Sequence, residues 1–257
     1  MTYKHLLIEK QDRIAWININ RPTKLNALNG EVLEELHAAF SAIKADEEVR
    51  VVVLTGSGEK AFVAGADIAE FAQFDVTEGE SLAKKGQDLV FDFIANMTQP
   101  VIAAVNGFAL GGGLELALSC HIRIASTNAR MGLPETSLGV IPGYGGTQRL
   151  AQLIGRGRAT ELILTCRMMG AEEALQTGLV SRVVPQEELL ATAAEMGGKI
   201  MNNSSNAIAH ALQSIAAGYE EGVDGFDVEI AHFGNCFGHL EFKEGTQAFL
   251  EKRKANY

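Results

Sequence analysis

The pattern of hydrophobic and polar positions begins with two short runs of mostly apolar and β-branched residues, 5–9 and 14–18. A polar segment at residues 10–12 separates them. Apolar runs of this length joined by a short polar segment are typical of a β-hairpin. We therefore expect the chain to open with two antiparallel strands that lead into a loop at residues 20–22.

Helical and strand patterns then alternate. From Gly30 apolar residues recur at helical spacing, and a mostly apolar run at residues 49–55 follows. The pattern returns in a helical stretch that ends before Pro100, with buried strands predicted at residues 101–105 and 121–126. Alternating helices and strands predict an α/β fold, although this pattern alone does not distinguish a doubly wound sheet from other α/β architectures.

The C-terminal part of the chain has a different pattern. After about Gly198 strand signals vanish, and helices are predicted at residues 207–217, 222–233 and 244–255. The last of these is charged and has few apolar positions. We expect one compact body with a helical appendage that packs on another element or subunit.

Composition narrows the class of protein. The chain has 257 residues, 47% hydrophobic and 21% charged, which is enough to bury a full core. The N-terminal ten residues lack the apolar stretch of a signal peptide, and no apolar run approaches the roughly 18 residues of a membrane span. The three cysteines lie far apart without metal-site spacing, so we expect a cytoplasmic protein with reduced cysteines and no bound metal.

The charge balance argues against nucleic acid as a partner. There are 22 basic and 32 acidic residues, which gives a formal net charge of −10, and no long run of Lys or Arg occurs. Binding to phosphate backbones depends on basic patches. We therefore expect neither a nucleic-acid partner nor a membrane partner.

Glu115 is the first candidate for chemistry. A buried strand at residues 101–105 runs through glycines at 111–113 into an apolar helix, whose first turn contains Glu115. Burying a carboxylate is costly unless it is partnered or used, while the free N–H groups of a helix start partly offset the cost. The glycines leave those N–H groups open to a ligand oxygen. A solvent-facing Glu and glycines that serve only close packing are the alternatives.

Two further segments carry candidate groups. Glu135 follows Pro134 between apolar residues, and by itself it resembles an ordinary Glu at a helix start. Residues 60–68 form a turn of small residues that leads into a short helix at Asp67, where Ala66 offers a second N–H. On its own, Asp67 is better interpreted as a helix N-cap.

Taken together, these segments resemble the enoyl-CoA hydratase/isomerase (crotonase) superfamily in order, spacing and composition. The resemblance covers nearly the whole chain, and the sequence is most similar to those of bacterial short-chain enoyl-CoA hydratases. The motifs that carry it are Asn20-Arg21-Pro22 with Asn26-Ala27-Leu28, Ala64-Gly65-Ala66-Asp67-Ile68, Asn106-Gly107-Phe108-Ala109-Leu110-Gly111-Gly112-Gly113, Pro142-Gly143-Tyr144-Gly145-Gly146-Thr147-Gln148-Arg149-Leu150 and Ala248-Phe249-Leu250-Glu251-Lys252-Arg253.

The resemblance implies a reaction and roles for four residues. The N–H groups of Ala66 and Gly112 would form an oxyanion hole for the thioester carbonyl of an acyl-CoA. Glu115 would take a proton from water as it attacks C3, and Glu135 would protonate C2. Such a hydration needs a base, an acid and preorganised donors but no metal or redox cofactor, since CoA belongs to the substrate. Relatives with other chemistries commonly lack one of the two glutamates, so retaining both favours hydration.

The resemblance also implies how CoA is held and how copies assemble. Contacts to CoA are expected from Lys24, Leu25, Ala27, Ala64, Asp67 and Ile68, and from Phe249 and Lys252 of a neighbouring subunit. A solvated Lys24 is the alternative for that residue. The implied fold is the crotonase spiral of repeated ββα units over residues 1–197, with a helical region at 198–257 that forms a homo-trimer and a hexamer.

Two stretches depart from the usual pattern of the superfamily. Tyr144 stands where many members have Ala, and residues 239–242 replace a more usual Thr/Ser-Glu-Asp stretch. We expect both to affect packing or the acyl pocket rather than the reaction. The six histidines form no catalytic or metal-binding pattern and are expected to be structural.

The sequence also bears on four alternative functions. Within the same chemistry, the alternatives are an enoyl-CoA isomerase, against which Glu115 argues, and a branched methylglutaconyl-CoA hydratase. Some relatives bind RNA through a lysine-rich helix, but here the corresponding residues 31–37 are acidic. A dinucleotide-binding fold is disfavoured because the glycines at 107 and 111–113 give no GxGxxG motif.

Overall fold

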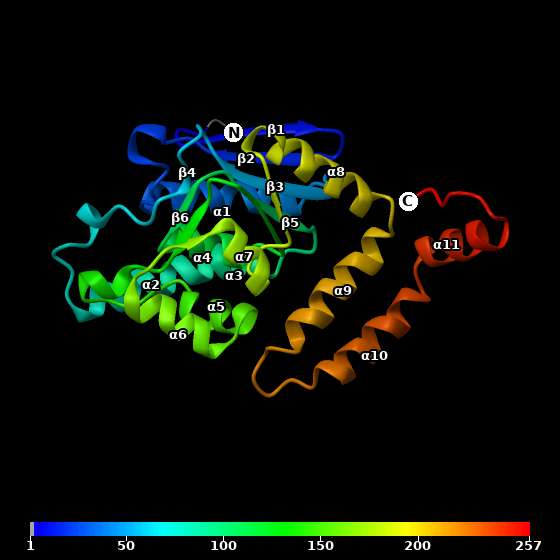
Figure 1. The fold of residues 1–257 in the computed structure, drawn as a ribbon. Helices are drawn as coiled ribbons and strands as arrows, with labels where there is room; N and C mark the ends of the chain where they lie inside the picture. The colour runs from blue at the N-terminus through cyan, green and yellow to red at the C-terminus, as the bar shows by residue number, and fades with distance from the viewer. Residues whose placement is uncertain (1–2) are drawn as a thin grey trace.

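The computed structural model describes residues 3–257 and contains two β-sheets surrounded by helices (Figure 1). The strands are β1 Leu6–Gln11, β2 Ile14–Ile19, β3 Val51–Gly56, β4 Ala61–Val63, β5 Val101–Val105, β6 Phe108–Leu110, β7 Ile122–Ser126, β8 Arg130–Gly132, β9 Met169–Gly170 and β10 Arg182–Val184. The α-helices are α1 Gly30–Lys44, α2 Val76–Gly86, α3 Asp92–Ala95, α4 Gly112–Ser119, α5 Gly146–Ile154, α6 Arg156–Thr165, α7 Ala171–Thr177, α8 Leu189–Met201, α9 Ser205–Ala217, α10 Gly225–Cys236 and α11 Leu240–Leu250. Short helical turns complete the chain, with 3-10 turns at η1 Pro22–Lys24, η2 Ile68–Glu70, η4 Glu135–Leu138 and η5 Gln186–Glu188 and a π-helical turn at η3 Gln87–Phe91.

The two sheets are built by a chain that spirals between them. The larger sheet has the order β1-β2-β3-β5-β7-β10, and the smaller one has the order β4-β6-β8-β9. Successive strand pairs, β3 and β4, β5 and β6, and β7 and β8, each place one strand in each sheet before helices follow. Neighbouring strands from successive turns pair in parallel. This repeat of two strands and a helical segment confirms the predicted ββα spiral and excludes a doubly wound sheet.

The central strands are buried on both faces, which explains why their sequence is apolar throughout. Every residue of β3 and β5 is buried. The pleat sends alternate side chains to opposite sides: Val52 and Leu54 join the main core, while Val51 and Val53 pack against α8 on the other face. The sheet is thus enclosed by helices on both sides, and it holds the strand ends that lead into the site in fixed positions.

The boundaries of several elements differ from the sequence prediction. Strand β3 begins at Val51 rather than residue 49, and β7 begins at Ile122 rather than residue 121. The helical stretch before Pro100 is not a single regular α-helix, because the π-helical turn η3 lies between α2 and α3. The short strands of the smaller sheet, three residues or fewer each, had no recognisable pattern in the sequence.

The last two helices begin and end at capping groups that periodicity does not show. Helix α10 starts after Asp224, whose side chain accepts from two main-chain N–H groups, so it begins later than the predicted residue 222. Helix α11 starts after His239, whose side chain accepts the N–H of Glu241. It ends at Leu250, and Lys252 then adopts a left-handed conformation, so the predicted helix at 244–255 was placed too late.

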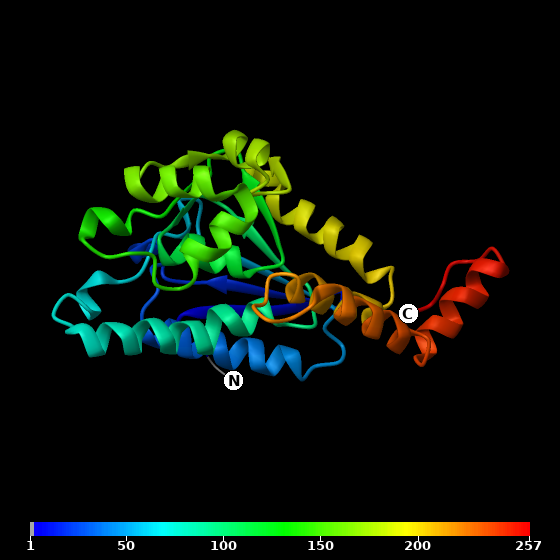
Figure 2. The same ribbon diagram turned by 90° about the horizontal axis from the view of Figure 1, so that it is seen from below.

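The C-terminal helices extend away from the sheets. Helix α8 packs on the larger sheet and continues to Met201, four residues past the expected boundary at 197. Helices α9 and α10 then form an antiparallel pair, and α11 lies beyond them at one end of the molecule (Figures 1 and 2). In the described part of the chain no helix is both long and apolar enough to cross a membrane.

Candidate active site

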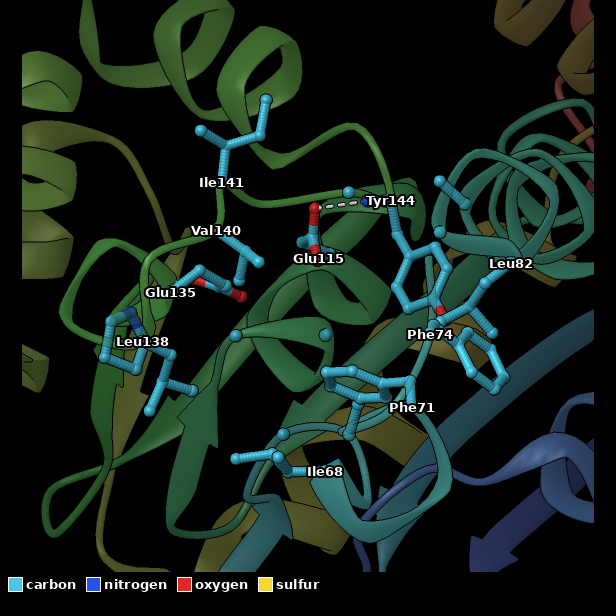
Figure 3. A pocket seen from close by; sticks show the side chains of 18 of the residues that line it. Ile68, Phe71, Phe74, Leu82, Glu115, Glu135, Leu138, Val140, Ile141 and Tyr144 are labelled. Atoms are coloured by element: carbon cyan, nitrogen blue, oxygen red, sulfur yellow. Dashed lines mark hydrogen bonds between the residues drawn. The ribbon is translucent and has the colours of Figure 1, made fainter. Parts of the chain in front are cut away.

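A cavity of 380 Å³ lies where the smaller sheet, the start of α4 and the segment around η4 meet. Figure 3 shows Glu115 and Glu135 pointing into this cavity from two different elements. Ala66 and Gly112 also line it, together with an apolar wall that includes Phe71, Leu82, Leu138, Val140, Ile141 and Tyr144. The structure therefore brings the four residues predicted to carry the chemistry into one site.

Glu115 enters the cavity from the first turn of α4 and is 1% exposed. Its Oε1 accepts hydrogen bonds from the main-chain N–H of Tyr144, at 2.7 Å, and of Gly146, at 2.8 Å. Two charge-assisted bonds of this kind stabilise an ionised carboxylate in a buried position. The alternative of a solvent-facing Glu at a helix start is therefore excluded.

The three glycines before Glu115 serve different purposes. Gly111 has φ +51°, a conformation that favours glycine, and a Cβ on it would lie 2.6 Å from Oε1 of Glu135. A Cβ on Gly113 would lie 1.9 Å from the carbonyl oxygen of Val63, so this glycine allows α4 to pack on β4. A Cβ on Gly112 would meet only ordinary contacts at 3.5 Å or more. Close packing thus explains Gly113, whereas Gly112 is at the cavity surface.

Glu135 begins the 3-10 turn η4, directly after Pro134. Its Oε2 is buried and has no hydrogen-bond partner within residues 3–257. The next residue, Thr136, donates its hydroxyl to the carbonyl of Ile163 at 2.7 Å and thereby ties η4 to the end of α6. Burial of a carboxyl oxygen without a hydrogen-bond partner favours the protonated form of the group.

The two carboxyls have raised pKa values. Burial raises the pKa of Glu115 to about 7, and the charge of Glu135 acts in the same direction. The N–H groups of Gly146 and Tyr144 and the positive charge of Arg149 oppose this rise. Burial also raises the pKa of Glu135. Two carboxyls with coupled, elevated pKa values are suited to exchanging protons near neutral pH.

Two main-chain N–H groups point away from the hydrogen-bond network beside these carboxyls. A parallel bridge joins Leu28 to Ala66 through the N–H groups of Leu28 and Asp67, which leaves the N–H of Ala66 outside the pairing. Gly112 is the first residue of α4, a position whose N–H has no partner within a helix. Within residues 3–257 neither N–H donates to a main-chain acceptor. Both residues line the cavity, where such donors can hold an oxygen.

Six of the eight residues expected to contact CoA, all from residues 24–68, are brought together at the rim of this site. The N–H of Ala64 donates to the carbonyl of Leu25, and the segment that contains Lys24 and Ala27 lies along residues 64–67. The buried Asn26 fixes this arrangement, since its side chain bonds to the main chain of Arg21, Ser57 and Ala61.

The individual side chains at this rim differ in exposure. Ala64 and Ile68 line the cavity itself, and Lys24 is exposed to solvent. Asp67 stands at the N-cap of η2, but its side chain makes no capping bond there and instead lies 3.4 Å from Arg21. Asp67 therefore occupies the expected N-cap position but does not make the capping hydrogen bond.

Phe249 and Lys252 are not part of the site within one chain. Phe249 is 82% exposed on α11, and Lys252 follows that helix. Helix α11 lies at the opposite end of the molecule from η2 and α2 (Figure 1). The structure of the single chain therefore leaves both residues free to contact another molecule.

Several residues of the site were missed by sequence reasoning. The N–H groups of Tyr144 and Gly146 come from a glycine-rich turn about 30 residues after Glu115. The glycines at 143, 145 and 146 were the sequence signal that could have indicated this turn. The Tyr144 ring stacks on Phe91 at 4.5 Å and lines the cavity, in agreement with the expected effect on packing and pocket. Within the described chain, none of the six histidines lines the cavity, and no group of three metal-binding side chains gathers.

The fold agrees with comparisons to known proteins. The family model described as enoyl-CoA hydratase/isomerase matches residues 9–257. A crystal structure of an enoyl-CoA hydratase from Bacillus anthracis has a TM-score of 0.91 and 41% identity, with 99% of each chain covered. The chain therefore belongs to the enoyl-CoA hydratase/isomerase family, and the resemblance seen in its motifs is confirmed.

Curated relatives within this family are similar over the full length. A short-chain-enoyl-CoA hydratase from Clostridium acetobutylicum is 47% identical over 255 residues, which cover 99% of this chain and 97% of that protein. A crotonyl-CoA hydratase from Syntrophomonas wolfei is 45% identical over 258 residues, which cover 100% of this chain and 99% of that protein. Both names denote the addition of water to an unsaturated acyl-CoA.

Proposed function

We propose that this protein is an enoyl-CoA hydratase, which reversibly adds water to the 2,3 double bond of a trans-2-enoyl-CoA to give a 3-hydroxyacyl-CoA. One observation carries the proposal: Glu115 and Glu135 face the same apolar cavity, which is also lined by Ala66 and Gly112 with their free N–H groups. The names of the similar proteins from Clostridium acetobutylicum and Syntrophomonas wolfei support it.

The proposed reaction uses the four groups together. Glu115 removes a proton from a water molecule as the water oxygen attacks C3. The electrons of the double bond move toward the thioester oxygen, which accepts hydrogen bonds from the N–H groups of Ala66 and Gly112. Preorganised donors at such a position typically contribute about 10²–10³ in rate each. Glu135 then delivers a proton to C2, and solvent exchange returns the proton from Glu115 to Glu135.

The surroundings of the two carboxyls support this division of roles. Two N–H donors and the nearby Arg149 favour the ionised form of Glu115, as a base requires. Glu135 has a buried oxygen without a partner in the described chain, which favours the protonated form that an acid requires. The proposed reaction needs no metal or redox cofactor, because the CoA thioester itself supplies the electron sink.

The rim of the cavity fits the CoA part of such a substrate. We assign the contacts to Lys24, Leu25, Ala27, Ala64, Asp67 and Ile68, which lie side by side on paired segments. Lys24 supplies a positive charge for a CoA phosphate in an otherwise acidic protein.

We further propose that α9, α10 and α11 assemble the chain into a trimer and a dimer of trimers. Large apolar side chains on these helices are strongly exposed, with Phe226 at 80%, Phe249 at 82% and Leu250 at 80%. Exposed apolar surface of this kind is typical of subunit interfaces. Phe249 and Lys252 of one copy would then complete the CoA site of its neighbour. Light scattering after size-exclusion chromatography tests this, and a monomeric wild-type protein at micromolar concentration would contradict it.

The reaction itself is tested by product analysis. Incubation of the protein with crotonyl-CoA in D₂O is expected to yield 3-hydroxybutyryl-CoA that carries one deuteron at C2, as shown by mass spectrometry and NMR. A parallel sample with a 3-enoyl-CoA separates hydration from isomerisation. Conversion of the 3-enoyl substrate without hydration of crotonyl-CoA would reject the hydratase in favour of an isomerase.

A further inference from the structure

The glycine-rich turn at residues 143–146 is held from two sides. On its inner side, the N–H groups of Tyr144 and Gly146 donate to Oε1 of Glu115 at 2.7 and 2.8 Å. On its outer side, the carbonyl of Gly143 accepts from the side chain of Gln87 at 2.7 Å, and that of Tyr144 accepts from Arg149 at 2.9 Å. Any movement of the outer contacts therefore moves the donors that hold Glu115.

One unusual stretch of helix supports these outer contacts, directly through Gln87 and indirectly through Asp92, which holds Arg149. Gln87 begins the π-helical turn η3, Phe91 ends it and stacks on the Tyr144 ring with an interplanar angle of 11°, and Asp92 pairs with Arg149 at 2.5 Å. The N–H of Asp92 bonds to the carbonyl of Gln87, five residues earlier. In a regular α-helix, residues five apart point about 140° away from each other. The π turn brings Gln87 and Asp92 onto the face that meets the glycine-rich turn.

We propose that the π turn Gln87–Phe91 and the Asp92–Arg149 pair form a positioning unit for Glu115, which acts by fixing the turn whose N–H groups hold that carboxylate. In this unit Arg149 is the central positioning residue. Its Nη1 holds the Tyr144 carbonyl while its Nη2 is held by Asp92. Isolated π turns recur at functional sites, where they displace side chains from the regular helical path.

Arg149 packs so closely against the glycine-rich turn that a displacement of its side chain would displace the turn. A Cβ on Gly145 would lie 2.3 Å from Nη1 of Arg149, and Gly145 has φ +92°. The Arg149 side chain is 18% exposed, whereas the Asp92 side chain is 48% exposed. A half-exposed ion pair contributes little stability by itself. Asp92 therefore acts mainly by orienting Arg149, and Arg149 in turn holds the glycine-rich turn in place.

The unit also has an electrostatic effect on the proposed base. The positive charge of Arg149 lowers the pKa of Glu115 against the larger effect of burial. Removing that charge raises the pKa of Glu115, so a larger share of the base is protonated at neutral pH. Loss of the Arg149 charge thus predicts a change in the pH profile, in addition to the lower rate expected when the turn is misplaced.

The test compares R149Q, R149K and D92N with the wild type, and it rests on the proposed hydratase function. With crotonyl-CoA we expect R149Q to lower kcat by about 10²-fold and to change KM by less than about threefold. The acid limb of its kcat profile moves to higher pH. R149K, which keeps the charge, leaves the limb near the wild-type position, and D92N shows a smaller loss of kcat than R149Q.

R167Q is the matched control. Arg167 also pairs with carboxylates, those of Glu161 and Glu173, but it lies outside the cavity lining.

A second readout separates this inference from the proposed function. The pKa of Glu115 is measured directly by carboxyl ¹³C NMR titration in the wild type and R149Q, with circular dichroism to match the folded fractions. An upward shift in R149Q supports the positioning unit even if crotonyl-CoA is not the substrate. An unshifted Glu115 pKa, or a kcat loss proportional to the unfolded fraction, overturns it. A wild type that fails to hydrate crotonyl-CoA while the NMR shift occurs contradicts only the proposed function.

Discussion

Replacing Glu115 by glutamine is expected to make the protein more stable while removing its activity. Glu115 is almost fully buried, and burial raises its pKa from an ordinary 4.5 to about 7. A carboxyl whose pKa is raised by folding binds its proton more tightly in the folded state. The fold is therefore favoured below pH 4.5 and loses this contribution as the pH rises through about 7.

The size of the effect follows from that difference in pKa. Each tenfold change in proton affinity corresponds to about 1.4 kcal/mol, so ionised Glu115 costs the fold about 3 kcal/mol at pH 8. The Glu115→Gln variant carries no such cost, because its amide oxygen still accepts the N–H groups of Tyr144 and Gly146. Its amide NH₂ has no acceptor assigned to it, which reduces the expected gain in the free energy of unfolding to about 2 kcal/mol.

The assay is thermal unfolding of both proteins at pH 8 and pH 5. A gain of about 2 kcal/mol raises Tm by about 4–8 °C in a chain of this size. At pH 5 little of the wild-type cost is present, so the advantage of the variant disappears there. Glu241→Gln is the control of opposite sign, since hydrogen bonds from Ser204, Ser205 and the Asn206 N–H lower the pKa of Glu241. That variant is expected to lose stability at pH 8. Equal Tm values of the wild type and Glu115→Gln at pH 8 would show that ionised Glu115 does not destabilise the fold.

Three further predictions follow from the same structure. Gly113→Ala places a Cβ 1.9 Å from the carbonyl oxygen of Val63, so we expect chemical denaturation to show a loss of at least about 2 kcal/mol in the free energy of unfolding. Gly157→Ala is the control, because open space surrounds that position, and it should change the free energy of unfolding by less than about 1 kcal/mol. Gly86→Ala places a Cβ 2.2 Å from Cε1 of Tyr144, so it should lower Tm, and an unchanged Tm would show that the ring moves freely. The kcat of hydration should rise with pH through an apparent pKa near 7, and a flat profile between pH 5 and 8 would argue against a buried carboxylate base.

The sequence predicts the larger sheet better than the smaller one. Strands β3 and β5 are buried, mostly apolar runs of six and five residues, and β7 has five residues with three of them buried, so all three are long enough for their pattern to be recognised. Strands β4, β6 and β8 have three residues each, and their pairing depends on the spiral rather than on local sequence. The spiral itself was inferred only through the family resemblance.

The candidate site was predictable where chemistry and local structure coincide. Glu115 stands out because a carboxylate follows glycines at the start of an apolar helix, a combination that is costly without a function. Its N–H donors were not predictable, because the turn that carries them is distant in sequence and is fixed by contacts with η3. A π turn depends on one extra residue in a helical stretch and leaves no periodic signal.

The most direct test of the central claim is the rate of crotonyl-CoA hydration by the wild type, Glu115→Gln and Glu135→Gln, followed by the loss of enoyl-thioester absorbance with matched folded fractions. We predict rapid hydration by the wild type and a loss of about 10²–10⁴-fold in kcat for each variant. KM should change far less than kcat, since neither carboxyl is assigned to CoA binding. Either variant retaining more than about a tenth of the wild-type rate would contradict the assignment of these two glutamates as base and acid.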